Sequence, residues 1–228
     1  MTKTERAAIL ARVDHTCLSP TATWREIRQL CDEGLCYQTA SVCLPPAYVA
    51  QAAAYLAGRL PVCTVVGFPL GYSTTMTKVG EAREAVASGA DEVDMVIRLG
   101  WLKEGNVQAV EDEIHAVKAA CREKILKVIV ETCCLTESEI AMLPAVVARA
   151  GADFIKTSTG FSRSGATPHD VKLLAANRPA GLKIKAAGGI TSFADAAEFL
   201  RLGADRLGTS RLVRLAMEED QSEQKGEI

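Results

Sequence analysis

Two lysines are the residues whose positions in this chain most favour chemistry. Lys156 ends the apolar run of ADFIKTSTG and Lys185 ends that of GLKIKAAGG, and small residues follow each of them. A buried ammonium group is costly, so a lysine beside an apolar run calls for a reason. The two lysines are 29 positions apart, a spacing that matches one β-α unit and places both at the active-site edge of a parallel sheet. This arrangement suits amine chemistry on a carbonyl substrate.

The chemistry that we expect is attack of a lysine amine on an aldehyde. A protonated lysine is not a nucleophile, but a second cation nearby and removal from water both favour the neutral amine. The resulting iminium accepts electrons during C–C bond cleavage, and Asp94, inside the apolar run EVDMVI, can then move protons. Taken singly, Lys156 is equally well explained as an ion-pair partner of Asp94, and Asp94 as a cap on backbone groups.

A repeated pattern marks the elements that must position these residues. SGADEV, AGADFI and LGADRL each join a helix end to a strand start through a glycine, which suits the position just past a helix. Divided over eight units, 228 residues give about 28 per unit, close to the roughly 30 of a β-α repeat. Short runs rich in Val and Ile, apolar on both faces, predict strands. The eight runs are residues 11–18, 39–45, 61–69, 92–97, 127–133, 153–159, 182–188 and 205–210.

Helix starts lie between these runs. Thr23–Glu26 and Thr136–Glu139 fit a capping box, and Pro168 fits the first turn of a helix. We therefore predict an α/β fold, a single (β/α)8 TIM barrel domain over residues 1–228, with a frayed polar tail from about residue 218. An open doubly wound sheet is the alternative, and eight evenly spaced units disfavour it.

In a barrel, the loops at the carboxyl ends of the strands build the active site. Besides the lysines and Asp94, these ends carry Asp14, Thr16, Cys43, Thr157 and Thr159. Small-residue turns at Gly188–Gly189 and Gly208–Ser210 follow the seventh and eighth strands, where barrels commonly bind phosphate through backbone N–H groups. The turns therefore predict a phosphorylated ligand.

Other charged residues have ordinary explanations. Lys183 lies nearer the start of its strand than Lys185, and we interpret it as structural. Lys127 and Glu131 share one strand face, which predicts an ion pair inside the barrel. His15 is interpreted as a hydrogen-bonded structural residue rather than a catalytic base.

Composition excludes several classes of partner. The formal net charge is −2 with scattered Lys and Arg, which points to neither nucleic acid nor an anionic membrane. No window approaches the roughly 18 apolar residues of a membrane span, and the first residues do not resemble a signal peptide. Eight cysteines without a C-x-x-C pair and three dispersed histidines predict buried reduced thiols and no metal site. We expect a soluble cytoplasmic protein.

These motifs together resemble the deoxyribose-phosphate aldolase family. The matching segments run in order from about residue 10 to residue 215 and are DHTCL, SVCLPP, VVGFPLG, ADEVDMVI, KVIVET, GADFIKTSTGF, KIKAAGGI and GADRLGTS. ADFIKTSTG and KAAGG in one chain make the resemblance specific. It implies a class I aldolase that needs neither metal nor cofactor, and that reversibly cleaves 2-deoxy-D-ribose 5-phosphate to acetaldehyde and D-glyceraldehyde 3-phosphate. It implies a Schiff base on Lys156 and proton shuttling by Asp94 and Lys185.

The phosphate site both matches and departs from the family pattern. Gly188, Gly189 and Ser210 match the phosphate-binding turns. Thr191 stands where an arginine is usual, and Arg211 stands where a small residue is usual. We hypothesise that Arg211, at the start of the helix after the eighth strand, supplies the charge that Thr191 cannot.

Other functions fit the residues less well. A phosphate-binding barrel isomerase or synthase would use both lysines only to neutralise ligand charge and would form no covalent adduct. A non-catalytic sugar-phosphate binding barrel would not need a buried Asp–Lys–Lys cluster. A class I aldolase for another aldehyde is the nearest rival. The expected partners are a sugar phosphate and an aldehyde, and since an exposed helix face commonly pairs such barrels, a homodimer is one possible assembly.

Overall fold

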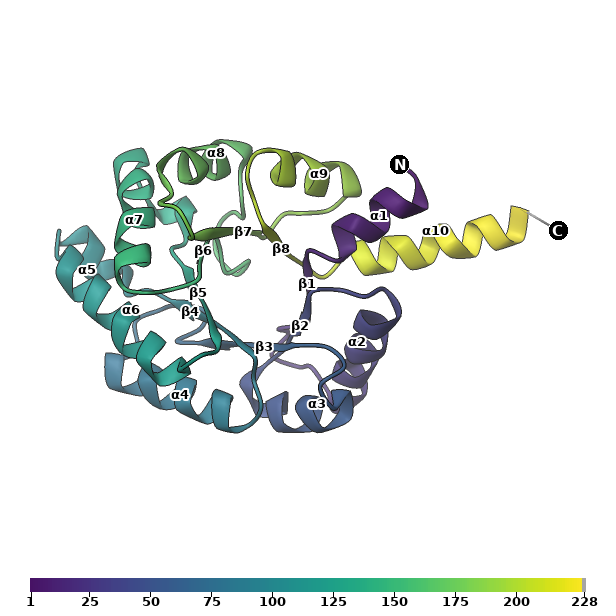
Figure 1. Ribbon diagram of the computed structural model, residues 1–228, viewed down its shortest axis with the longest axis horizontal. Coiled ribbons are helices and arrows are strands. Elements are labelled where there is room, and N and C mark those ends of the chain that lie inside the picture. The colour runs from purple at the N-terminus through teal and green to yellow at the C-terminus, as the bar shows by residue number, and fades with distance from the viewer. Residues whose placement is uncertain (227–228) are drawn as a thin grey trace.

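The computed structural model describes residues 1–226, in which eight parallel strands close into a barrel (Figure 1). Asp14 on the first strand pairs with Ser41 on one side and with Gly208 on the other, and this closes the ring. The strands are β1 (Val13–Thr16), β2 (Ser41–Cys43), β3 (Val62–Val66), β4 (Glu92–Val96), β5 (Ile125–Ile129), β6 (Phe154–Lys156), β7 (Lys183–Ala187) and β8 (Arg206–Thr209). The predicted TIM barrel is confirmed, and the closed ring rules out the open sheet.

The strands end earlier than the apolar runs that predicted them. The run over 153–159 contains the three-residue strand β6, and the run over 127–133 contains the end of β5, which starts at Ile125. The residues beyond the strand ends, such as Thr157 and Thr159, belong to loops at the carboxyl face. These residues are buried like the strand itself, so the end of the buried run does not mark the end of the strand.

Helices cover the outside of the barrel (Figure 1). They are α1 (Lys3–Leu10), α2 (Trp24–Cys36), α3 (Val49–Leu56), α4 (Thr75–Ala87), α5 (Leu99–Lys103), α6 (Val107–Cys121), α7 (Glu137–Arg149), α8 (Pro168–Asn177), α9 (Phe193–Arg201) and α10 (Leu212–Gly226), with 3₁₀ turns at Pro46–Tyr48 and Thr132–Cys134. Within residues 1–226, no helix has the length and apolar character that a membrane crossing requires.

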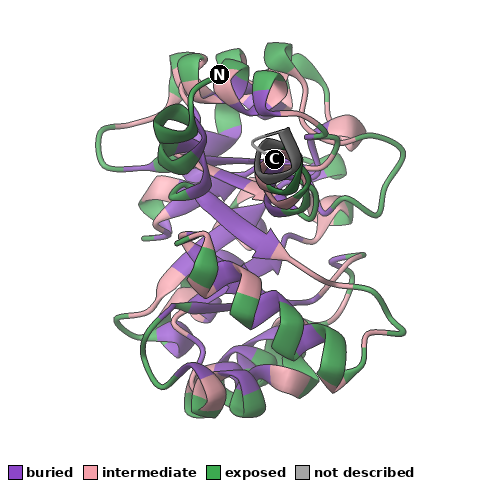
Figure 2. Ribbon diagram, turned by 90° about the vertical axis from the view of Figure 1, so that its right-hand side faces the viewer, coloured by how far each residue is buried: buried purple, intermediate pink, exposed green. Residues whose placement is uncertain are grey.

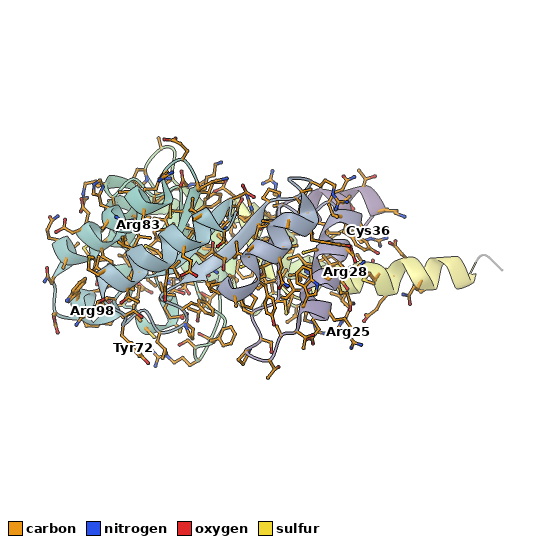
Figure 3. The ribbon with its side chains drawn as sticks, turned by 90° about the horizontal axis from the view of Figure 1, so that it is seen from below. Arg25, Arg28, Cys36, Tyr72, Arg83 and Arg98 are labelled. Carbon is orange, nitrogen blue, oxygen red and sulfur yellow. The ribbon has the colours of Figure 1, made fainter. Side chains whose placement is uncertain are left out.

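The last described element is α10, which extends past the ring of helices (Figure 3). The polar tail expected from about residue 218 begins inside this helix, and its backbone stays helical to Gly226. Residues 227–228 lie outside the described part of the chain. Figure 3 also places Arg25 and Arg28 on α2 and Arg83 on α4, toward opposite ends of the molecule.

The predicted helix boundaries have the expected local structure. Thr23 and Thr136 each form a capping box with the glutamate three residues later, and Pro168 is the first residue of α8. Gly89, Gly151 and Gly203, one in each GAD repeat, have positive φ angles of 103°, 83° and 111° just after a helix. Glycine adopts this conformation without steric cost, so each repeat ends a helix and turns the chain into the next strand.

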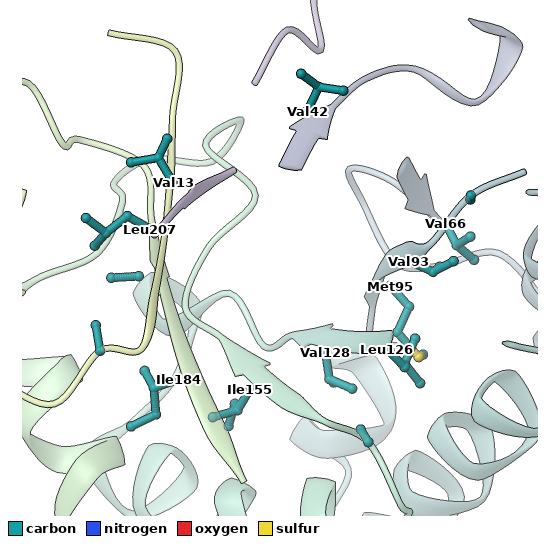
Figure 4. Close-up of a cluster of buried hydrophobic side chains, with 14 of the residues drawn as sticks. Val13, Val42, Val66, Val93, Met95, Leu126, Val128, Ile155, Ile184 and Leu207 are labelled. Carbon is teal, nitrogen blue, oxygen red and sulfur yellow. The ribbon is translucent and has the colours of Figure 1, made fainter. Parts of the chain in front are cut away.

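The main apolar core lies between the strands and the helices rather than inside the barrel. Figure 4 shows its strand side chains, and Figure 2 shows that the strands are buried while the outer helix faces are exposed. The labelled buried residues are Val13, Val42, Val66, Val93, Met95, Leu126, Val128, Ile155, Ile184 and Leu207. Several of these immediately precede a buried charged residue, since strand side chains alternate between faces. The expectation that both strand faces are apolar is therefore wrong for the interior face.

The cysteines only partly match the expectation of buried thiols. All eight are free. Four of them (Cys31, Cys43, Cys63 and Cys121) are buried, whereas Cys36 is exposed and the other three are half-buried.

Candidate active site

The two lysines that the sequence singled out meet on one carboxylate. The register pairs Lys156 on β6 with Lys185 on β7, so both side chains point into the barrel. Their Nζ atoms donate to the same oxygen of Asp94 on β4, Oδ2, at 2.8 Å for Lys156 and 2.7 Å for Lys185. The structure thus brings together the three residues for which we expected catalytic roles.

A glycine on β8 leaves room for this arrangement. A methyl group at Gly208 would lie 3.0 Å from Cε of Lys185 and 2.9 Å from Cβ of Ala187. Since such contacts are tighter than most observed in proteins, a side chain at Gly208 would displace Lys185. The GTS motif therefore contributes space for a catalytic side chain as well as a turn.

Further charged residues surround these three inside the barrel. Lys185 also donates to Asp14 Oδ2 at 2.5 Å. Lys127 on β5 contacts Asp94 at 2.7 Å, Glu92 at 2.6 Å and Asp14 at 3.3 Å. Arg206 on β8 contacts Asp14 and, at 3.2 Å, Glu92. The cluster combines four cationic side chains (Lys127, Lys156, Lys185 and Arg206) with three carboxylates (Asp14, Glu92 and Asp94).

The cluster fixes the charge of its members. Burial would raise the pKa of Asp94, but attraction to Lys127, Lys156 and Lys185 outweighs it and holds the pKa well below 3.8. The pKa of Asp14 is likewise lowered, since Lys127, Lys185 and Arg206 together overcome its burial. Burial would lower the pKa of Lys185, yet the two carboxylates raise it above 10.5. At neutral pH, Asp94 is therefore a carboxylate and Lys185 an ammonium group.

Lys156 differs from the other two lysines of the cluster. Lys127 and Lys185 each contact at least two carboxylates, whereas within the described residues the Lys156 side chain has one hydrogen-bond partner, Asp94. The cluster has four cationic side chains and three carboxylates, so it has one more cationic side chain than it has carboxylates. Lys156 is also the lysine that borders the open pocket. Its amine is the one that a substrate can reach.

This pocket has a volume of about 450 Å³ and opens at the carboxyl face of the barrel. The residues expected to bind substrate or phosphate all line it: Thr16, Thr159, Gly188, Gly189, Ser210 and Arg211. Lys156 lies at its inner end, while Asp94 and Lys185 are completely buried beneath it and do not line it.

The glycine turn after β7 forms one wall of the pocket. Gly188 and Gly189 have φ angles of 81° and 76°, which other residues rarely adopt. The loop before α8 packs directly on this turn, because Ala166 N donates to Ala187 O at 3.0 Å and a methyl group at Gly165 would lie 2.3 Å from the Gly188 carbonyl. The turn is therefore held rigidly with little side-chain bulk over it.

The other wall contains the available positive charge. Ser210 and Arg211 are exposed and directly precede α10, whose N-terminal N–H groups favour anions. Arg211 forms no ion pair within the described residues. Thr191, in contrast, donates its hydroxyl to Asp195 Oδ2 at 3.0 Å, as part of the N-terminus of α9. Arg211 is thus free to meet a ligand anion, and Thr191 has another role.

Glu131 does not pair with Lys127, so that sequence prediction is wrong. Glu131 follows β5 in a left-handed conformation with φ 54° and ψ 65°, which turns its side chain away from the interior face of the strand. Its carboxylate accepts hydrogen bonds from the Thr159 hydroxyl at 2.5 Å and the Thr159 amide at 3.3 Å. Glu131 therefore fixes the pocket loop that follows Lys156.

Sequence reasoning gave Lys127 the wrong partner and left out Glu92 and Arg206. Their spacing was the available signal, because each lies two residues from another interior position on its own strand. These pairs are Lys127 and Ile129, Glu92 and Asp94, and Arg206 and Gly208. The alternation of strand faces would have placed them in the interior.

Residues given ordinary roles lie outside the cluster. His15 is hydrogen-bonded to Glu33 of α2 at 2.8 Å, and Lys183 is exposed with its Nζ 5.5 Å from the centre of the Phe154 ring. Thr16 lines the pocket and donates its hydroxyl to the Asp14 carbonyl at 2.8 Å.

Two thiols adjoin the cluster and could be considered as metal ligands. Cys43, Cys63 and Asp94 have ligand atoms within 4.8 Å of one another. Cys63 Sγ, however, donates to Asp94 at 3.3 Å and accepts from Lys127 at 3.2 Å, and its burial raises its pKa well above 9.0. A protonated thiol is a poor metal ligand, and the ammonium group of Lys127 already balances the carboxylate. This donor set does not fit a metal ion.

Comparison with known proteins supports one family. Residues 8–210 match the model of the DeoC/LacD family aldolases. The chain is 56% identical over 207 residues to a deoxyribose-phosphate aldolase of Streptococcus agalactiae serotype Ia, covering 91% of this chain and 93% of that protein. It is also 56% identical over 211 residues to a deoxyribose-phosphate aldolase of Streptococcus pyogenes serotype M28, covering 92% and 95%.

Solved structures agree. The structure of a deoxyribose phosphate aldolase from Aeropyrum pernix, described as tetrameric, superimposes with a TM-score of 0.84 at 34% identity, over 91% of this chain and 89% of that one. With motifs, fold, interior lysines and relatives in agreement, the chain belongs to the deoxyribose-phosphate aldolase family of DeoC/LacD aldolases.

Proposed function

We propose that the protein reversibly cleaves 2-deoxy-D-ribose 5-phosphate to acetaldehyde and D-glyceraldehyde 3-phosphate through a Schiff base on Lys156. The observation that carries this proposal is the position of the Lys156 amine, at the inner end of the pocket and on the Asp94 oxygen that Lys185 shares. The family relatives at 56% identity carry the same activity in their names.

The reaction begins with the neutral Lys156 amine and the C1 aldehyde of the open-chain sugar. The nitrogen attacks C1 to form a carbinolamine, and loss of water then gives an iminium. Lys185 is held as an ammonium group by Asp14 and Asp94, so it can supply the proton that the departing hydroxyl needs. Asp94 contacts both nitrogens and can pass a proton between them.

The iminium then accepts the electrons of the C2–C3 bond. As this bond breaks, the C3 hydroxyl loses its proton and becomes the aldehyde of D-glyceraldehyde 3-phosphate, while C1 and C2 remain on Lys156 as an enamine. A proton added to C2 gives the iminium of acetaldehyde, and water releases it. Two proton transfers thus take place near Lys156, where the buried Asp94–Lys185 pair is within hydrogen-bond reach.

The sugar phosphate fits the far end of the pocket. The turn at Gly188–Gly189 offers backbone N–H groups without side-chain obstruction, and the start of α10 favours an anion. We assign to Arg211 the positive charge that binds the phosphate, since the Thr191 hydroxyl donates to Asp195.

Replacing Arg211 with alanine tests this assignment. Because a hydrogen bond to a charged group contributes about 1.5 to 3 kcal/mol, we expect KM for the phosphorylated sugar to rise about tenfold or more, with kcat nearly unchanged. KM for unphosphorylated 2-deoxyribose should not change. The matched control is Arg214→Ala, which removes an exposed arginine on the next turn of α10. An unchanged KM for the phosphorylated sugar in Arg211→Ala would show that another group binds the phosphate.

Borohydride trapping tests the proposed function. The protein is incubated with 2-deoxyribose 5-phosphate, reduced and digested, and the modified peptide is identified by mass spectrometry. We expect one adduct, on Lys156, because the other interior lysines contact at least two carboxylates each and do not line the pocket. A folded protein that binds the sugar phosphate but gives no adduct would contradict the proposal. Lys156 and Lys185 would then only neutralise the charge of the ligand, as in an isomerase or a binding protein.

A further inference from the structure

We propose that Arg206 is a positioning residue for Lys185, acting through the carboxylate of Asp14. The inference rests on the proposed function, because it concerns the proton transfers assigned to Lys185. Arg206 lies on β8, two residues before Gly208, and pairs in register with Lys185 on β7. It therefore belongs to the interior face but one layer deeper than the pocket, and it does not line the pocket.

The two oxygens of the Asp14 carboxylate have different partners. Oδ1 accepts hydrogen bonds from Arg206 and, at 2.8 Å, from the Ser41 hydroxyl. Oδ2 accepts from Lys185 at 2.5 Å and lies 3.3 Å from Lys127. Because Oδ1 is hydrogen-bonded to Ser41 of β2 and Arg206 of β8, the carboxylate cannot rotate freely, and Oδ2 stays directed at Lys185.

Arg206 is itself anchored from the opposite side of the barrel. Its Nη1 contacts Glu92 of β4 at 3.2 and 3.3 Å, and its Nη2 contacts Glu92 at 3.4 Å. The guanidinium carbon also lies 5.6 Å from the centre of the Phe154 ring. Nη1 of Arg206 bridges Asp14 Oδ1 and Glu92, and Nη2 adds a second contact to Glu92, so the planar guanidinium is fixed in orientation.

The consequence concerns the geometry of Lys185. Its Nζ is suspended between Asp14 Oδ2 and Asp94 Oδ2, at 2.5 and 2.7 Å, and the second of these oxygens also holds Lys156. If Asp14 turns, Lys185 loses one of its two supports and moves relative to Lys156. Groups that orient metal ligands typically cost about 10- to 100-fold in activity when removed, and we expect an effect of that order for a group that orients Lys185. Arg206 thus affects the proton transfers assigned to Lys185 and leaves substrate binding and the Lys156 amine in place.

Arg206→Gln provides the test, with two readouts. We expect kcat for 2-deoxyribose 5-phosphate to fall about tenfold with KM within about twofold of the original, and Arg206→Lys to restore activity only in part. Hydrogen exchange at the methyl group of acetaldehyde in D₂O, followed by NMR, should slow by about the same factor, because it requires the Lys156 iminium and proton transfer at C2 but no cleavage of the C2–C3 bond. Borohydride should still trap the adduct on Lys156. Unchanged exchange, or a change confined to KM, would overturn the inference.

A double-mutant cycle tests the route through Asp14. If Arg206 acts through that carboxylate, Arg206→Gln should add almost nothing to the loss caused by Asp14→Asn, whereas independent effects would multiply. Multiplying effects would contradict the inference. The matched control is Arg178→Gln, which removes a half-buried arginine paired with Asp205 at 2.5 Å outside the barrel and should leave exchange unchanged.

Further results distinguish failure of the variant to fold, failure of the proposed function and failure of the role of Arg206. If Arg206→Gln does not fold, the variant Arg206→Gln/Glu92→Gln removes one charge of each sign, and the same exchange and cycle criteria apply to it. If the original protein gives neither adduct nor exchange, the proposed function fails. If it gives both and Arg206→Gln exchanges at the original rate, only the role of Arg206 fails.

Discussion

Replacing Lys156 with leucine is expected to lower kcat/KM for 2-deoxyribose 5-phosphate by at least about 10⁴-fold and to abolish the borohydride adduct. The loss is this large because, among the residues that the structure describes, no other lysine lines the pocket: Lys185 and Lys127 are completely buried and each contacts at least two carboxylates. Without the iminium, nothing accepts the electrons of the C2–C3 bond. The measurement combines steady-state rates with mass spectrometry of the reduced protein.

The fold should survive this substitution. Removing Lys156 takes one cation from a cluster of four cations and three carboxylates, which leaves the charges balanced. We therefore expect the unfolding temperature to change by only a few degrees. Lys172→Leu, which removes an exposed lysine of α8, is the control and should retain both activity and adduct. Normal turnover by Lys156→Leu would contradict the assignment of the nucleophile.

The sequence predicted the barrel because its signals are local. Glycine after each GAD helix, capping boxes at Thr23 and Thr136, and apolar runs of strand length each depend on neighbouring residues only. The same local pattern places Lys156 at the end of its strand, whereas Lys185, also expected at a strand end, lies in the middle of β7. Their convergence on Asp94 then follows from closure of the ring, since β4, β6 and β7 point side chains into one interior.

The deeper cluster could not be predicted in the same way. Lys127 and Glu131 share a strand face in an ideal strand, but β5 ends at Ile129 and Glu131 adopts a left-handed conformation. Which carboxylate each cation meets depends on the stagger of the strands around the barrel, as for Arg206 and Glu92 on β8 and β4. That stagger is a property of the closed sheet and has no signature in a single segment.

The second large loss of activity is expected from removing Lys185, because Lys156 is the nucleophile and Lys185 is the proton donor. Lys185→Met keeps the length of the side chain but removes the ammonium group that Asp14 and Asp94 hold. General acid–base groups contribute about 10² to 10⁴ in rate, so we expect kcat to fall about 10³-fold. Stopped assays of product formation measure this loss. Lys183→Met is the control, because Lys183 is exposed on the same strand and should tolerate the change.

The adduct distinguishes this variant from Lys156→Leu. Lys185→Met retains the Lys156 amine on Asp94, so long incubation with substrate followed by borohydride should still label Lys156. Exchange of the acetaldehyde methyl hydrogens should slow about as much as turnover, since both depend on the same proton transfers. If labelling disappears while exchange persists, the two lysines have exchanged roles, and Lys185 would be the nucleophile. If turnover stays within about tenfold, water or Asp94 alone moves the protons, and the buried ammonium group serves only to balance charge.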